Sequence, residues 1–350
     1  MTNHIHLSPR FLHHYHSLKT ITYHLILDYL FGGLVNSTDV LVLRGLRGVG
    51  DETLIALLDF AKANSISSLE SLAKADISAI PLRQFPPSLL DLMDTKDFSK
   101  QRERFSNEQE KWKSDEINLI VYGSEGYPEQ LLDLLKPPPI LFCRGNLDLL
   151  GETRAIAVVG TRKNTPLGAK ITNKSVEAFG GFGFSIVSGL ALGIDTIAHK
   201  SALECNAPTI AVLVDVSKIS PSTNINLAQG ILDNGGLLIA ENPPGIKVIP
   251  AYFAKRDRIQ AGLSKAVFAI ETAINGGTMH AVNAAKSMGR PVYVPDASQA
   301  GYSDLEIPAI SGTQWLVDEG IASPYTRASY PTILETLDGP NGSSTQGTRI

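Results

Sequence analysis

The feature that most constrains the fold is a regular alternation that begins at Thr153, in which short apolar runs are separated by segments with helical spacing. Most of these runs are continuously apolar, as expected for strands that are covered on both faces. They span residues 155–159, 184–187, 209–214, 237–240, 266–270 and 291–294. The pattern predicts an α/β fold, with a Rossmann-like, doubly wound and mostly parallel sheet over residues 118–325.

A smaller, all-helical domain is predicted before this sheet, over residues 1–95. Its clearest part is segment 39–64, whose apolar spacing indicates two helices joined by a tight turn from Gly45 to Gly50. This is the form of a helix-hairpin-helix, whose turn amides can hold a phosphate group. The same turn often serves only to pack two helices together, and we favour that role here.

Two further segments complete the predicted domain organisation. Residues 96–117 are strongly charged and almost free of aliphatic side chains, which predicts an exposed helix or linker between the two domains. After residue 325, Pro, Gly, Ser and Thr dominate, so residues 326–350 are expected to form a disordered tail.

The composition is that of an ordinary soluble protein, with 43% hydrophobic and 19% charged residues in a chain of 350. The two cysteines, Cys143 and Cys205, cannot build a disulfide framework, and no segment resembles a signal peptide or a membrane span. We therefore expect a cytoplasmic protein. Six of the eight histidines lie within the first 24 residues, and a solvated tail is favoured there over a metal site because no cysteine or carboxylate cluster joins them.

Positive charge is concentrated locally, although the net charge is -4. Residues 151–200 carry six Lys or Arg against three acidic residues, and residues 247–265 carry five against one. These stretches coincide with Gly-rich turns at which an apolar run ends and a helical pattern begins. Such junctions direct backbone N–H groups and a helix dipole at one anion, which favours a phosphate-bearing polymer as the partner.

The turns are expected to meet, because the carboxyl ends of parallel strands lie at the same edge of a sheet. A glycine there allows close backbone approach, and an arginine offers a planar, permanently charged group for phosphate. The predicted nucleic-acid site consists of Gly160, Thr161, Arg162, Lys163, Ser188, Gly189, Lys255, Arg256, Arg258, Gly276, Gly277 and Thr278.

The sequence offers little support for catalysis. The glycine that follows Gly160 and Arg162 is Gly168, so the dinucleotide fingerprint is absent, and no P-loop occurs. No nucleophile with a persuasive base and no metal-ligand cluster emerges, so we expect no enzyme activity, no cofactor and no metal. Asp195 is expected to cap a helix and His199 to pack against the sheet.

The order of the motifs resembles one known family, DNA-processing protein A, also called Smf. The similarity is carried by "PPPILFCRG", "AVVGTR", "SGLALGIDTIAHKSAL", "ENPPG", "RDRIQAGLS" and "GRPVYVPD". It implies binding of single-stranded DNA, a homodimer, and loading of a RecA-type recombinase without enzymatic turnover. By motif matching, Arg162 corresponds to a DNA-contacting arginine, and Lys255, Arg256 and Arg258 correspond to a basic loop.

The chain departs from the family pattern at several positions. Asp257 stands where the family usually has asparagine, which places a negative charge among the basic residues. The stretches at Gly276-Gly277-Thr278 and Gly312-Thr313-Gln314 also differ, and no C-terminal winged-helix module is visible. Two alternatives therefore stay open: a repurposed member that is the partner or antitoxin of a toxin in a phage-defence pair, and a nucleotide-binding sensor.

Overall fold

A computed structural model describes residues 36–298 and 308–339. The chain forms two compact units, which divide between Phe105 and Ser106. The His-rich N-terminal stretch and residues 340–350 lie outside the described residues, so the predictions made for them stay predictions.

The first unit is helical, as expected. It contains α2 (Ser37–Gly45), α3 (Asp51–Ala63), α4 (Leu69–Leu72), the 3-10 helix η1 (Ile77–Ala79) and α5 (Pro87–Thr95), and α6 (Ser99–Ser114) runs from this unit into the second. The turn between α2 and α3 has the predicted hairpin form. Its Gly48 has a φ of 90°, a conformation that favours glycine.

A buried carboxylate organises the polar contacts of the first unit. The carboxylate of Asp39 is fully buried, accepts a hydrogen bond from the Leu69 amide at 3.1 Å, and accepts two from the Arg102 guanidinium. Arg102 also donates to Glu70, and this hydrogen bond lowers the pKa of the Glu70 carboxyl to about 2, against the opposing effect of burial. The contacts of Asp39, Arg102 and Glu70 therefore hold α2, α4 and α6 together.

The second unit is built on a nine-stranded sheet. Its strands are β1 (Ile117–Val121), β2 (Ile140–Gly145), β3 (Ala155–Val159), β4 (Ser185–Ser188), β5 (Thr209–Leu213), β6 (Leu237–Ala240), β7 (Ala266–Ala269), β8 (Val292–Pro295) and β9 (Ser323–Tyr325). The spatial order is β1-β2-β6-β5-β4-β3-β7-β8-β9, in which the β1–β2 and β2–β6 pairs are antiparallel and the pairs from β6 to β9 are parallel. The predicted fold class is confirmed.

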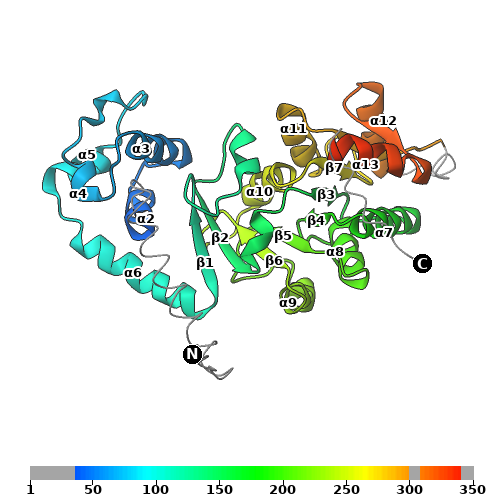
Figure 1. Ribbon diagram of the computed structural model, residues 1–350, viewed down its shortest axis with the longest axis horizontal. Coiled ribbons are helices and arrows are strands. Elements are labelled where there is room, and N and C mark those ends of the chain that lie inside the picture. Colours follow the sequence, from blue (N-terminus) through cyan, green and yellow to red (C-terminus); the bar gives the residue numbers. More distant parts are fainter. Residues whose placement is uncertain (1–35, 299–307, 340–350) are drawn as a thin grey trace, which may run out of the picture. The chain divides into compact units, whose positions relative to one another are not determined.

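Helices cover both faces of the sheet (Figure 1). One face carries α7 (Pro166–Gly181), α8 (Ile194–Glu204), α9 (Ile225–Asp233) and α13 (Tyr330–Asp338), and the other carries α10 (Pro250–Gly262), α11 (Met279–Ser287) and α12 (Pro308–Asp318). The alternation of side chains along β3 supplies both layers, because Ile156 and Val158 join the first core while Ala157 and Val159 join the second. Short 3-10 turns lie at η2 (Glu129–Asp133), η3 (Leu147–Leu150), η4 (Ser222–Asn224) and η5 (Arg327–Ser329).

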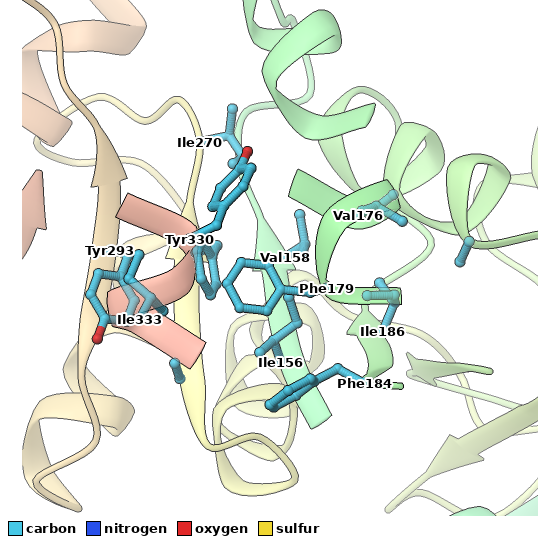
Figure 2. Packing of buried hydrophobic residues seen from close by; sticks show 14 of the residues in the cluster. Ile156, Val158, Val176, Phe179, Phe184, Ile186, Ile270, Tyr293, Tyr330 and Ile333 are labelled. Atoms are coloured by element: carbon cyan, nitrogen blue, oxygen red, sulfur yellow. The ribbon is translucent and has the colours of Figure 1, made fainter. Parts of the chain in front are cut away.

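The prediction of a disordered tail is wrong for residues 327–338, which form η5 and α13. Tyr330, Ile333 and Leu337 recur at helical spacing and are buried in the core cluster shown in Figure 2. There the ring of Tyr330 lies edge-on to Phe179 of α7, with the ring centroids 5.5 Å apart. The apolar face of this helix outweighs the polar composition of the segment around it.

The order in which the chain adds strands to the sheet reverses at β3. From β3 the chain first builds outward through β4, β5 and β6, and then returns to place β7 on the other side of β3. In open α/β sheets, ligands bind in the crevice at the carboxyl ends of the strands beside such a switch point. A ligand site is therefore expected at the carboxyl ends of β3 and β7. Among the described residues, no helix is long and apolar enough to cross a bilayer.

Candidate nucleic-acid interface

A pocket of about 390 Å³ lies at this switch point. It is lined by residues that follow β3, β4 and β7 and by one side of α10. The predicted site residues that line it are Gly160, Thr161, Arg162, Lys163, Arg256, Gly276, Gly277 and Thr278. All three predicted turns therefore contribute to one pocket, although the turn after β4 does so through Ala191 and Asp195 and not through the predicted Ser188 and Gly189.

The loop after β3 is held by Glu271, a fully buried residue that follows β7. The Thr161 amide donates to the Glu271 carbonyl at 2.8 Å, and the carboxylate of Glu271 accepts from the amide and hydroxyl of Thr165 at 2.9 and 2.6 Å. The backbone amide of Lys163 donates a hydrogen bond to the Thr161 hydroxyl. This framework leaves the side chains of Arg162 and Lys163 exposed at the mouth of the pocket.

Glycines allow the start of α8 to approach this loop closely. A Cβ on Gly160 would lie 2.5 Å from the Ile194 side chain, and a Cβ on Gly193 would lie 2.2 Å from the Thr161 carbonyl oxygen. Gly193, with a φ of 78°, is the residue that precedes α8. The predicted capping role of Asp195 is therefore wrong: its carboxylate lies in the first turn and accepts from the Gly189 and Ala191 amides.

The predicted basic loop is wrong, because Lys255, Arg256 and Arg258 lie within helix α10. Arg256 points to the pocket and is only 4% exposed. Its Nη2 donates to the Gly189 carbonyl at 2.8 Å. A Cβ on Gly189 would lie 1.5 Å from Nη1 of Arg256, so this glycine provides the space in which the guanidinium lies.

Lys255 and Arg258 take part in a different cluster. Arg258 donates to both carboxylate oxygens of Glu241 at 2.8 and 2.7 Å, and Lys255 lies 3.0 Å from the same carboxylate. Arg258 also donates to the Lys136 carbonyl. The carboxylate of Glu241 is 1% exposed, so these cations neutralise a buried anion outside the pocket and are not assigned to the site.

Ser188 is likewise not part of the pocket surface. It is completely buried, and its hydroxyl donates to the Val158 carbonyl of the neighbouring strand at 2.7 Å. Gly189 lies behind Arg256 and does not line the cavity. Ser188 and Gly189 thus support the site from behind, whereas the sequence suggested direct phosphate contact.

Two carboxyl groups face the buried guanidinium. Burial raises the pKa of the Asp257 carboxyl from its ordinary 3.8 to about 7, with Asp195 adding to the rise and Arg256 and Arg162 opposing it. Burial also raises the pKa of Asp195, against the opposing effect of Arg256 and the backbone amides that it accepts from. The charge of the pocket therefore changes near neutral pH, through Asp257.

The turn from Gly276 to Thr278 is more closed than an anion nest requires. The amides of Met279, His280 and Ala281 donate back to the carbonyls of Gly276, Gly277 and Thr278. Nothing lies within 4 Å of a Cβ built on Gly277, so this glycine faces open space. The turn contributes a wall of the pocket. The amides of Met279, His280 and Ala281 already donate to backbone carbonyls and are therefore not available to an anion.

Several lining residues were not identified from the sequence, among them Phe253, Gln260 and Thr272. The Arg162 guanidinium lies over the ring of Phe253, with Cζ 5.7 Å from the centroid. Gln260 donates from Nε2 to Oδ1 of Asp257 at 2.8 Å. The signal that could have found Phe253 and Gln260 is helical spacing, because they lie three residues before and four residues after Arg256.

His199 packs against the sheet, as predicted. It is fully buried, its Nδ1 lies 2.8 Å from the Thr209 hydroxyl, and burial lowers the pKa of the ring to about 3. Within the part of the chain that the structure describes, no group of three or more His, Cys, Asp or Glu side chains is arranged to hold a metal ion.

The family model described as DNA recombination-mediator protein A matches residues 118–337, which is more than half of the chain. The chain belongs to this family. The expected family is therefore confirmed, and the matched span coincides with the sheet unit that carries the pocket.

Relatives in the DNA recombination-mediator protein A family are similar over part of their length. Protein Smf of Escherichia coli is 36% identical over 204 residues, which is 58% of this chain and 53% of that protein. DNA processing protein DprA of Bacillus subtilis is 33% identical over 183 residues, which is 52% of this chain and 61% of that protein. The aligned region thus spans little more than half the length of these two relatives.

Solved structures of the family match a larger part of the chain. The crystal structure of DprA from Streptococcus pneumoniae superimposes with a TM-score of 0.71 and 26% identity, and covers 86% of this chain and 98% of that one. DprA from Helicobacter pylori, described for its single-stranded DNA binding mode, matches with a TM-score of 0.55 and 27% identity, over 63% of this chain and 96% of that one.

Proposed function

We propose that this chain binds single-stranded DNA in the manner of its family, with backbone phosphates at the mouth of the pocket and without catalytic turnover. The observation that carries the proposal is the convergence of Arg162, Lys163 and Arg256 at the carboxyl ends of β3 and β7. Membership of the DNA recombination-mediator protein A family and the single-stranded DNA binding described for the Helicobacter pylori relative support it.

The two exposed cations have the properties that phosphate contacts need. Arg162 and Lys163 are solvent-exposed, and the loop that carries them is fixed through Glu271, so little backbone order must be gained on binding. Phosphate contacts of this kind give affinity without sequence preference, and each one makes binding weaker at high salt. The expected complex is therefore salt-sensitive.

A titration by fluorescence anisotropy tests this proposal. The full chain is titrated with labelled single-stranded and double-stranded oligonucleotides at two salt concentrations. We expect tighter binding of the single strand, and Arg162→Ala with Lys163→Ala should lower the salt slope by about 1.4, since each single-strand contact contributes about 0.7. Lys286→Ala is the control, because Lys286 is an exposed lysine in the last turn of α11. Equal salt slopes in all three proteins would contradict the proposal.

Three finer parts of the proposal rest on the family resemblance. These are loading of a RecA-type recombinase, formation of a homodimer, and the alternative of a toxin partner in a phage-defence pair. Light scattering of the purified chain tests the dimer, and strand-exchange assays with the host recombinase test loading. A toxin reading frame beside the gene would favour the partner role, and a set of competence genes would oppose it.

A nucleotide-binding sensor is the second candidate function. The observation in its favour is the pocket itself, whose 390 Å³ falls within the range of about 300–1,000 Å³ that is usual for small-molecule sites. Calorimetry with mononucleotides and with an oligonucleotide distinguishes the two. Binding of a mononucleotide without binding of the oligonucleotide would favour the sensor.

A further inference from the structure

A second hollow, of about 400 Å³, lies between α7 and the segment that joins β9 to α13. It shares no lining residue with the pocket at the ends of β3 and β7. Its lining is mostly apolar, with Leu167 and Ile171 contributed by α7, Tyr325 by the end of β9 and Tyr330 by the start of α13. Nothing in the proposed function so far uses this hollow.

Three exposed basic residues, Lys170, Lys174 and Arg327, also line the hollow, and no acidic residue does. Among the described residues, neither Lys170 nor Arg327 forms an ion pair. Lys174 pairs only with Glu177, three residues later on the same exposed side of α7, and such a surface pair contributes about 0–1 kcal/mol. The positive charge of this hollow is therefore available to a ligand, because no buried carboxylate neutralises it.

The position of the hollow continues the proposed strand-binding surface. It opens at the carboxyl ends of β8 and β9, the two strands that follow β3 and β7 in the sheet order, and strands lie about 4.8 Å apart. The two hollows are therefore separated by about 10 Å along one edge of the sheet. Helix α7 begins at Pro166, three residues after Lys163. Lys170 and Lys174 lie one turn apart on the same side of this helix, about 6 Å along its axis, so they extend the line of exposed cations.

We propose that a bound DNA strand crosses the edge of the sheet at the loop after β3 and enters this second hollow. Its phosphates lie on Lys170, Lys174 and Arg327, and a base lies against the apolar lining. A groove that combines cations with aromatic and aliphatic side chains is suited to a single strand, which has an anionic backbone and flat apolar bases. This inference rests on the proposed binding of single-stranded DNA and lengthens the stretch of strand that the protein contacts.

The aromatic part of the hollow is held in place by the core beneath it. The Ser175 hydroxyl lies 2.9 Å from the hydroxyl of Tyr325 and 3.1 Å from that of Tyr330. The ring of Tyr330 also packs edge-on against Phe179. Burial raises the pKa of both tyrosines, so their hydroxyls are neutral at neutral pH and add no negative charge. The hollow is thus already formed, and little order must be gained when a strand enters it.

The experiment measures anisotropy with the full chain and labelled oligothymidines of about 5 and about 15 nucleotides, near the two ends of the usual range of site sizes. Lys170→Ala with Arg327→Ala should lower the salt slope of the long oligomer by about 1.4, since each contact contributes about 0.7. A fourfold increase in salt should then weaken binding about sevenfold less than in the unmodified protein. Affinity for the short oligomer should change by less than about twofold, because the first pocket is intact.

A charge-matched control is Lys200→Ala with Lys286→Ala. Both lysines are exposed on helices, α8 and α11, and neither lines either hollow. This double variant removes the same number of positive charges, so it corrects for the general loss of attraction between the protein and the strand. Its salt slope for the long oligomer should match that of the unmodified protein.

The outcomes separate this inference from the function on which it rests. An unchanged salt slope for the long oligomer in Lys170→Ala with Arg327→Ala would overturn the second hollow while strand binding stands. Failure of both oligomers to bind the unmodified protein would overturn both proposals. An oligoglutamate peptide tests the other anionic partner: if the variant loses the peptide but binds the long oligomer normally, the hollow is a protein-docking surface. A change in the mass measured by light scattering would place it between copies of the chain and contradict the proposal.

Discussion

The two sides of α10 show how neighbouring cations acquire different roles. Arg256 faces the pocket, where its Nε lies 3.4 Å from a carboxylate oxygen of Asp257 and neither Nε nor Nη1 has a hydrogen-bond partner. Arg258, two residues later, donates to both oxygens of a buried Glu241 and is thereby neutralised. Residues two positions apart in an α-helix point in nearly opposite directions, about 200° apart, so one short basic segment supplies two environments.

The comparison teaches that charge density along the sequence is a poor measure of charge available to a ligand. The stretch from Lys255 to Arg258 suggested one basic surface, yet Lys255 and Arg258 offset an internal carboxylate. What the pocket keeps is a buried guanidinium beside Asp257, with Arg162 and Lys163 at its entrance. The pocket side of α10 is therefore less positive than the sequence indicates.

Substitution of Asp257 should produce the largest effect on stability. Because the folded protein keeps this proton up to about pH 7 and the unfolded chain releases it near 3.8, the folded state is stabilised below that window and loses the stabilisation as the pH rises through it. The asparagine of Asp257→Asn cannot ionise, so this variant does not lose the stabilisation as the pH rises. The free energy of unfolding of Asp257→Asn relative to that of the unmodified protein should therefore increase by up to about 4 kcal/mol between about pH 4 and pH 8. Urea unfolding at each pH measures this difference.

Removal of Arg258 tests the other side of the helix. Arg258→Ala removes both hydrogen bonds of Arg258 to the buried Glu241 carboxylate and should destabilise the protein by about 3 kcal/mol, while the folded protein keeps its affinity for a single strand. Denaturant unfolding and anisotropy measure the two quantities. Adding Glu241→Gln should recover part of the loss. A stable variant that no longer binds would place Arg258 in the site after all.

Much of the fold could be predicted because buried parallel strands leave continuous apolar runs. The predicted run 155–159 coincides with β3, and 237–240 coincides with β6. Helix α13 was missed because its apolar residues are embedded among Pro, Ser and Thr. Helix α10 was taken for a loop since its exposed and pocket-facing positions are polar, although Pro250 at its start is a typical helix-initiating residue.

The site could be predicted only in outline. Glycine turns after strands located the pocket, because strand ends of a parallel sheet meet in space. Which side chains reach it depends on helix phase and on distant partners such as Glu241, and neither is visible in local composition. Ser188 illustrates the point, since its hydroxyl bonds to the adjacent strand and not to a ligand.

The space behind Arg256 is the next test of the comparison. Gly189→Ala places a methyl group where Nη1 of Arg256 lies, so the guanidinium must move and lose its bond to the Gly189 carbonyl. We expect destabilisation by about 2 kcal/mol and weaker binding of single strands. The matched control is Gly181→Ala at the end of α7, outside the pocket lining, which has nothing within 4 Å of the added methyl and should change stability by less than about 0.5 kcal/mol. Equal changes in stability and in single-strand affinity in the two variants would show that the position of the Arg256 guanidinium does not matter for either.

The smallest expected effect concerns Phe253, which joins the pocket side of α10 to the exposed cations. Its ring lies beneath the Arg162 guanidinium, an arrangement worth about 0.5–1 kcal/mol at partly exposed sites. Phe253→Leu keeps an apolar side chain and should weaken single-strand binding about threefold by anisotropy. In an Arg162→Ala background the same change should have less effect, because the two residues act together. Strictly additive losses would show that the ring and the guanidinium act independently, and that only the cations of the entrance matter.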